Sequence, residues 1–186
     1  SGNILLAKNF NCSANDVCNS VTSDNNGNVL MTGNFFGPQM EIDTYTLSGN
    51  GSTDVYVSKL DAGLNAIWAK SAGGSFNDIG LSVAADGSGN VYVCGDFLSP
   101  SFIAETFTLN SNGAFDVFAL KYSASGNAVL AKSHGGNFDD TGVGILPDGA
   151  GGYYISGHFH STSVVIGTYT FSSQGDGDIY LAQFNS

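Results

Sequence analysis

Three histidines have the residue type and spacing that metal chemistry would need. His158 and His160 alternate, so they share one face of an extended strand, and His134 lies shortly before Asp139 and Asp140. Imidazole nitrogens with nearby carboxylates are ligands that Zn²⁺ accepts. The sequence therefore predicts His134, His158 and His160 as its candidate metal ligands, and it predicts no cofactor other than Zn²⁺ or Ca²⁺.

Aspartates recur at fixed places along the chain. Asp16, Asp78 and Asp140 each precede an expected strand, where a carboxylate could serve general acid or base chemistry. Catalysis needs one unique constellation, so a residue that recurs three times is better explained as a loop cap or a lysine partner. No nucleophile elbow, phosphate-binding loop or zinc-protease motif is present. We predict no catalytic residues.

A second set of aspartates, Asp24, Asp86 and Asp148, opens glycine-rich turns such as DGSGN at 86–90. These turns are too short for the twelve-residue calcium loop of an EF-hand. Asp and Gly supply the geometry of a tight hairpin turn, which is the interpretation that we favour. Calcium bridging by these carboxylates is the alternative.

Both sets recur because the chain repeats itself. The stretch 66–97 reappears at 128–159 and at 4–35, always 62 residues apart. We divide the single domain 1–186 into repeats 1–62, 63–124 and 125–186. Such a period is typical of units that bury their apolar faces by stacking on copies of themselves.

Each repeat contains four strand-like runs, at 80–85, 90–97, 116–122 and 127–133 in the middle copy. Tight turns join the first to the second and the third to the fourth, which predicts an up-and-down meander. The connection 98–115 contains a short extra strand or hairpin around TFTL at 106–109. Several runs are apolar almost throughout, as expected of a sheet that is covered on both faces.

The repeat resembles the bacterial β-propeller family often called SBBP. The resemblance rests on DVFALKY at 116–122, AVLAKSHGGNFDDTG at 128–142 and DGSGNVYVCGDF at 86–97. It covers the whole chain, although the first repeat has Asn11 and Cys12 in place of the Gly-Gly pair. The resemblance implies a part of a large secreted or surface-attached bacterial protein, and it implies no particular reaction.

We therefore expect an all-β fold of three tandem 62-residue propeller blades, each a four-stranded antiparallel meander. The segment 3–8 corresponds to an outermost strand and 178–184 to the third strand of a blade, so the two ends are complementary. Three blades fall below the roughly four to eight of closed propellers. We expect a partner copy completing a six-bladed ring, a head-to-tail array, or membership of a larger propeller.

The charge balance excludes nucleic acid as a partner. The formal net charge is −11, from 16 acidic residues against 5 lysines and no arginine. All five lysines occupy repeat-equivalent places, at 8, 70 and 132 and at 59 and 121, with Gln183 in the remaining slot. We interpret them as structural cations.

The three cysteines are relevant to the cellular compartment of the protein, because disulfides form in oxidising compartments. Cys12 and Cys18 enclose a short loop where the other repeats have glycines, and they could form a disulfide or remain free. Cys94 lies mid-strand, where a buried free thiol is expected. No segment is apolar enough to span a membrane, and low Lys and Arg content favours a secreted or cell-surface protein.

We expect a non-enzymatic structural or binding module of an exported bacterial protein that contacts a protein or glycan. The expected binding rim comprises Asn34, Phe36, Asp96, Phe102, His158 and His160. Phe35, Phe97 and Phe159 could also provide stacking platforms or could pack between blades. The alternatives are a subunit of an extracellular filament or ring, joined by strand pairing between chains, and a hydrolase or lyase acting on the propeller face.

Overall fold

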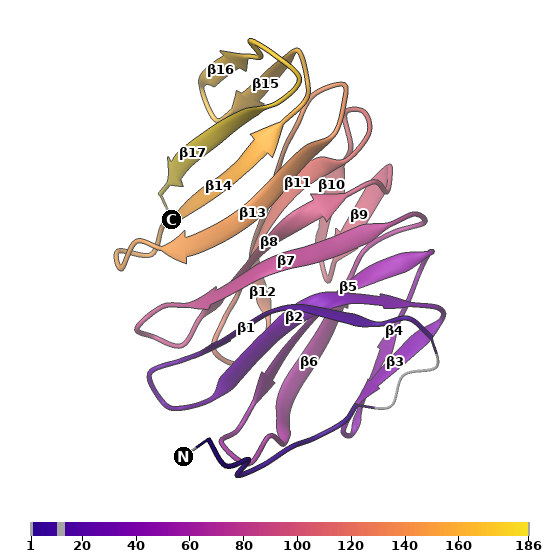
Figure 1. The fold of residues 1–186 in the computed structure, drawn as a ribbon, viewed down its shortest axis with the longest axis vertical. Coiled ribbons are helices and arrows are strands. Elements are labelled where there is room, and N and C mark those ends of the chain that lie inside the picture. Colours follow the sequence, from indigo (N-terminus) through magenta and orange to yellow (C-terminus); the bar gives the residue numbers. More distant parts are fainter. Residues whose placement is uncertain (1, 11–13, 186) are drawn as a thin grey trace.

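The computed structural model describes residues 2–10 and 14–185, and within these ranges it contains seventeen strands and no helix. The fold is all-β, and the strands within each sheet pair in antiparallel fashion, as predicted (Figure 1). The strands are β1 (Val17–Ser23), β2 (Val29–Phe36), β3 (Gln39–Ile42), β4 (Tyr45–Ser48), β5 (Thr53–Leu60), β6 (Ala66–Ala72), β7 (Asp78–Ala85), β8 (Val91–Phe97), β9 (Ser101–Ala104), β10 (Phe107–Asn110), β11 (Asp116–Tyr122), β12 (Ala128–His134), β13 (Asp140–Pro147), β14 (Tyr153–Phe159), β15 (Ser163–Ile166), β16 (Tyr169–Ser172) and β17 (Asp178–Phe184).

Three meander sheets follow one another along the chain. The first sheet has the order β1-β2-β5-β6, the second β7-β8-β11-β12, and the third β13-β14-β17. Figure 1 shows them stacked along the long axis of the molecule, with β7 lying against both β1 and β13. The third sheet has three strands among the described residues, and the sheets do not close into a ring.

A two-stranded ribbon accompanies each sheet: β3-β4, β9-β10 and β15-β16. The predicted extra hairpin within 98–115 is thus confirmed. β4 packs on β6, and β10 packs on β12, so each of these two ribbons covers the outermost strand of its own sheet. β9 also reaches back to β6 of the preceding sheet, and Ile103 exchanges backbone hydrogen bonds with Gly73, the residue that follows β6.

A glycine recurs in the second strand of every sheet for a steric reason. A Cβ on Gly95 would lie 1.9 Å from the Ile79 carbonyl oxygen of the neighbouring strand. Gly33 and Gly157 face the same contact, at 1.8 and 1.9 Å. Each contact adjoins an irregularity in the pairing, such as the one between Gly80 and Ser82. Only a residue without a side chain tolerates this approach.

The core lies between the sheets. All seven residues of β8 are buried, and so are all but one of β11, which confirms that these two inner strands of the middle sheet are covered on both faces. Val55 and Val57 of the first sheet pack into one cluster with Phe118 and Leu120 of the second. Val117 and Ala119 pack with Ile155 and Tyr180 of the third sheet in another. Stacking therefore supplies the burial that a single meander lacks.

Candidate binding groove at the edge of the third sheet

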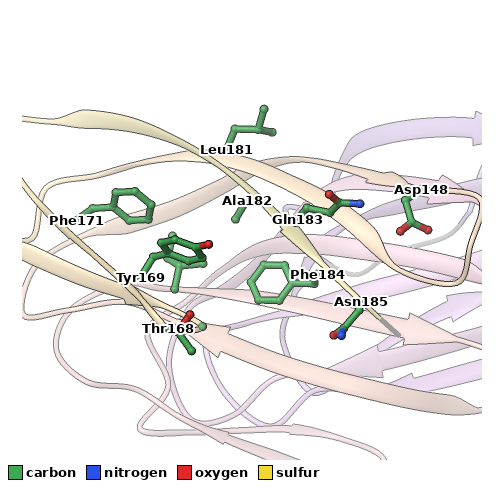
Figure 2. Close-up of a pocket in the computed structure, with 11 residues that line it drawn as sticks. Asp148, Thr168, Tyr169, Phe171, Leu181, Ala182, Gln183, Phe184 and Asn185 are labelled. Atoms are coloured by element: carbon green, nitrogen blue, oxygen red, sulfur yellow. The ribbon is translucent and has the colours of Figure 1, made fainter.

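A groove of about 840 Å³ runs between β17 and the β15-β16 ribbon. Figure 2 shows Tyr169 and Phe171 on the ribbon side and Leu181 and Phe184 on the β17 side. The residues that line it are Asp148, Ile166, Gly167, Thr168, Tyr169, Phe171, Leu181, Ala182, Gln183, Phe184 and Asn185.

The groove exists because β17 has one strand neighbour where its counterparts have two. β5 pairs with both β2 and β6, and β11 pairs with both β8 and β12. Among the described residues, β17 pairs with β14 alone. Its other edge therefore presents unpaired backbone N–H and C=O groups, which form a template for a further strand.

The ribbon wall is exposed where the other ribbons are covered. Phe171 is 37% exposed, whereas Leu109 and Leu47, one and two repeats earlier, are 8% and 5% exposed. Those leucines lie beneath the outermost strands β6 and β12, which their ribbons contact. The groove is thus the space that an outermost strand fills in the first two sheets.

The outward face of β17 continues this exposed surface. Ile179 and Leu181 are 89% and 70% exposed, whereas their equivalents Val117 and Ala119 are each 1% exposed. A hollow of about 390 Å³ adjoins Leu181 on this face and is lined in part by Leu146 and Tyr154. The third sheet therefore offers an apolar face and an open edge together.

The chemistry of the groove is that of binding. Its lining is mostly aromatic, aliphatic and amide, and Asp148 is the one charged residue in it. The Tyr169 and Phe171 rings stack with centroids 6.5 Å apart. An edge of hydrogen-bonding groups beside apolar walls suits an extended peptide, whose backbone and alternate side chains would contact both.

The predicted histidine site is not assembled. The His158 and His160 rings contact each other with centroids 5.4 Å apart, and the His160 ring hydrogen-bonds the Asp176 carbonyl. His134 is instead buried, with its ring stacked 4.8 Å from that of Phe184. Burial, with the charge of Lys132, lowers the pKa of His134 to about 4.

Within residues 2–10 and 14–185, no three or more His, Cys, Asp or Glu side chains gather so that they could hold a metal ion. The His134, His158 and His160 prediction fails because β12 turns His134 into the core.

The predicted rim is only partly at the surface. Phe36 is 48% exposed, and Asn34 accepts a hydrogen bond from Asn19 at 3.3 Å. Asp96 is buried and accepts from Thr141 at 3.1 Å, and burial raises the pKa of its carboxyl to about 6. Phe102 is fully buried, with its ring 4.9 Å from that of Phe118, so its assignment to the rim was wrong. Alternation along β9 directs Phe102 inward.

The aspartates serve as caps and turns, as predicted. Asp78 accepts from the Gly74 N–H at 2.7 Å and from the Ser99 hydroxyl at 2.8 Å. Asp140 makes the same two contacts one repeat later, with Gly136 and Ser161. The turn aspartates Asp24, Asp86 and Asp148 each accept from the backbone N–H two residues ahead.

The cysteines divide between core and surface. Cys94 is fully buried and donates its thiol proton to the Gly142 carbonyl at 3.2 Å, as expected of a structural thiol. Cys18 is exposed. Cys12 lies outside the described residues, so the Cys12–Cys18 disulfide stays a prediction.

The groove was not among the sites predicted from the sequence. The signal was present in Ile179, Leu181 and Gln183, which alternate on one face of the last expected strand. Their exposure depends on which neighbours are absent, and pattern alone does not show this.

No family model matches the chain. The chain is 26% identical over 160 residues to an uncharacterized WD repeat-containing protein, L264, of Acanthamoeba polyphaga mimivirus. That match covers 78% of this chain and 12% of the relative. The chain is also 28% identical over 137 residues to the regulatory protein FlaEY of Caulobacter vibrioides, covering 72% of this chain and 14% of FlaEY. The chain thus spans a small part of the length of either relative.

Together with the antiparallel all-β architecture, the WD repeat similarity fits a β-propeller type of repeat. Among the described residues there is no helix that could cross a membrane.

Proposed function

We propose that this chain is a non-enzymatic, propeller-type repeat module that binds an extended segment of a protein by adding it as a strand to β17. The observation that carries this proposal is the unpaired edge of β17 facing an apolar groove. Strand addition uses main-chain hydrogen bonds for affinity and side-chain pockets for specificity.

A protein segment suits the groove better than a glycan. Backbone groups along β17 offer donors and acceptors at the spacing of another polypeptide strand, about 4.8 Å away. The Tyr169 and Phe171 rings would cover every second side chain of that strand. The proposal includes no catalysis, in keeping with a lining whose one charged residue is Asp148.

The SBBP-type resemblance and export from a bacterium belong to the same proposal. They are supported by the repeat pattern and by a low-lysine, acidic composition. The similarity to a WD repeat-containing protein and to a regulatory protein is in keeping with a binding role.

A peptide panel tests the proposal. Fluorescently labelled ten-residue peptides with alternating apolar residues, such as repeated Thr-Val, are titrated into the 186-residue chain, and polarisation is measured. We expect saturable binding and slower amide exchange in residues 179–184. The variant Phe171→Asp should abolish binding, whereas Val165→Asp, on the exposed side of β15, should not.

Two results would contradict strand addition at β17: no peptide of the panel binds, or binding is unchanged in Phe171→Asp. Binding of glycans in place of peptides at the stacked Tyr169–Phe171 pair would assign the groove to a different partner.

A further inference from the structure

A second hollow, of about 430 Å³, lies at one end of the third sheet. Its lining defines what we call the His160 hollow and comprises Ala114, Phe138, Asp139, His160, Gly175 and Asp176. None of these residues lines the groove beside β17, so the two sites are separate. The volume falls in the range of ligand sites, roughly 300 to 1,000 Å³.

The pairing of the third sheet brings the lining residues together. Phe159, the last residue of β14, lies opposite Asp140 at the start of β13 and opposite Asp178 at the start of β17. The loop residues that adjoin these three strand ends therefore meet at the same end of the sheet. The His160 backbone N–H donates to the Asp139 carbonyl at 2.9 Å, which joins two of the loops.

The hollow is a place where the third repeat departs from the other two. Three of its lining residues are titratable: Asp139, His160 and Asp176. Their equivalents carry no charge, and they are Asn15, Phe36 and Ser52 in the first repeat and Asn77, Leu98 and Ala114 in the second. The repeat architecture needs none of the three titratable groups, so their presence together indicates a local function.

The His160 ring is held in one orientation. Its Nδ1 atom hydrogen-bonds the Asp176 carbonyl, and Nδ1 carries the proton because a carbonyl can only accept. The ring also contacts His158 edge-on and lies against Gly177, where a Cβ would be 2.9 Å from Cε1. The second repeat has Phe115 in place of Gly177, so the glycine makes room for the ring. In the neutral imidazole, Nε2 is left as a hydrogen-bond acceptor.

The carboxylates of the hollow lack a cationic partner. None of the ion pairs within residues 2–10 and 14–185 involves Asp139 or Asp176, and both residues are exposed. Asp96 adds a buried carboxyl nearby, with one oxygen that has no hydrogen-bond partner. Burial and the charge of Asp139 together raise the pKa of Asp96 to about 6. The hollow is therefore a region of negative potential that favours a cation.

We propose that the His160 hollow binds an arginine side chain of a protein partner. The guanidinium would lie on the Phe138 ring, which is 55% exposed, and donate to the carboxylates of Asp139 and Asp176 and to Nε2 of His160. The Phe138 backbone N–H donates to the Ser161 hydroxyl at 2.9 Å, which fixes the loop that carries the ring. A planar cation with five donors matches an aromatic wall beside three acceptors.

Arginine fits the hollow better than other cations. A lysine ammonium is a compact point charge, so it neither lies flat on a ring nor forks between two carboxylates. A metal ion lacks ligands, because no three His, Cys, Asp or Glu side chains in the described part of the chain gather closely enough to hold one. The sequence has 16 acidic residues and no arginine, so a basic partner is complementary to it in charge.

A nuclear magnetic resonance titration tests the proposal. The blocked pentapeptide GGRGG is added to the isotope-labelled 186-residue chain. We expect saturable shifts of the amide signals of residues 138–139, 160 and 175–177, with a Kd on the order of 1 mM. GGKGG should bind at least about fivefold more weakly, and the same peptide with uncharged citrulline should not bind.

Three results of this titration would overturn the proposal. They are no saturable shift with GGRGG, equal binding of the citrulline peptide, and equal binding of GGKGG.

Substitutions test the residues of the hollow. Asp139→Asn and Asp176→Asn should each weaken GGRGG binding at least about fivefold, because each removes a charge-assisted hydrogen bond. Glu41→Gln, at an exposed position of β3, removes the same charge elsewhere and should bind like the parent. Equal weakening in Glu41→Gln would show that net charge alone attracts the peptide, and it would overturn the site.

A triple variant gives the third repeat the residues of the second. The chain with Asp139→Asn, His160→Leu and Asp176→Ala should keep its circular dichroism spectrum and lose GGRGG binding. Binding that survives in this folded variant contradicts the proposal. The single variants decide the question if the triple variant does not fold.

The arginine site does not depend on strand addition at β17. Phe171→Asp should leave GGRGG binding unchanged, and Asp139→Asn should leave the binding of Thr-Val peptides unchanged. If Thr-Val peptides fail to bind while GGRGG binds, only strand addition is wrong. Loss of GGRGG binding in Phe171→Asp would place the arginine in the groove and not in the His160 hollow.

Discussion

The Lys59 ammonium lies 2.9 Å from the Asp24 carboxylate in a site where both side chains are almost wholly buried. Burial by itself would raise the pKa of Asp24, but hydrogen bonds from Asn28 and Lys59 outweigh it and hold the pKa well below its ordinary value. Lys59 also donates to the Gly89 carbonyl, so this ion pair ties the first sheet to the second.

Removing the cation should be costly. Lys59→Met leaves the Asp24 carboxylate buried without its partner, and we expect the free energy of unfolding to fall by about 3 kcal/mol. Urea denaturation at pH 7 measures this. Lys132 is an exposed lysine on β12, at the position that Lys70 occupies one repeat earlier. Lys132→Met should change the free energy of unfolding by less than about 0.5 kcal/mol. Equal losses in both variants would show that the buried pair does not matter.

Stability should depend on pH through buried carboxyls. Burial raises the pKa of Asp78, Asp96 and Asp116 from 3.8 to about 6. Between these values the folded chain keeps protons that the unfolded chain has released, so the free energy of unfolding falls as pH rises and stays low above about pH 6. His134 acts oppositely, since its lowered pKa removes stability as pH falls from 6.5 toward 4. Three carboxyls outweigh one histidine, so urea denaturation should show higher stability at pH 4.5 than at pH 7.5.

Asp116→Asn isolates one of these carboxyls. Asp116 accepts from the Asn112 N–H through one oxygen, while the other is buried without a hydrogen-bond partner. Asn keeps the acceptor and removes the charge. We expect about 2 kcal/mol of added stability at pH 7.5 and almost none at pH 4. Asp176→Asn, at an exposed position, should change neither. A gain that is the same at both pH values would rule out the titration of Asp116 as its cause.

The glycine of each second strand can be tested at Gly95. In Gly95→Ala the new Cβ would lie 1.9 Å from the Ile79 carbonyl oxygen and 3.0 Å from the Phe118 ring. We expect the free energy of unfolding to fall by about 3 kcal/mol or more. Gly87→Ala meets only an Asn25 side-chain nitrogen at 4.0 Å and should be nearly neutral. Thermal unfolding followed by circular dichroism measures the stability of both variants. Equal stability of the two variants would contradict the prediction.

The Cys94 thiol should be inert in the folded chain. It is fully buried, and burial raises its pKa, so little thiolate forms. In a Cys12→Ser, Cys18→Ser background, Ellman's reagent should report no thiol until urea unfolds the chain. Complete reaction within minutes under native conditions would place Cys94 at the surface.

The local elements could be predicted because their determinants are local. The expected runs agree with β7, β8, β11 and β12 to within two residues, and the turn aspartates behave as their type and spacing indicate. The histidine site failed because strand alternation places His158 and His160 together but says nothing of His134, whose surroundings come from another sheet. The assignment of Phe102 to the binding rim was wrong for a similar reason, since the burial of this side chain is decided by what packs on β9.

The sequence by itself determined the repeat and the all-β meanders, because a 62-residue period and strand patterns are properties of the chain alone. The tertiary structure decided which equivalent side chains are covered: Ala119 is buried and Leu181 is exposed, although both occupy the same place in their repeats. The reason is that burial in a stacked fold comes from the neighbouring sheet. Equivalent residues therefore differ in exposure wherever no neighbouring sheet covers one of them.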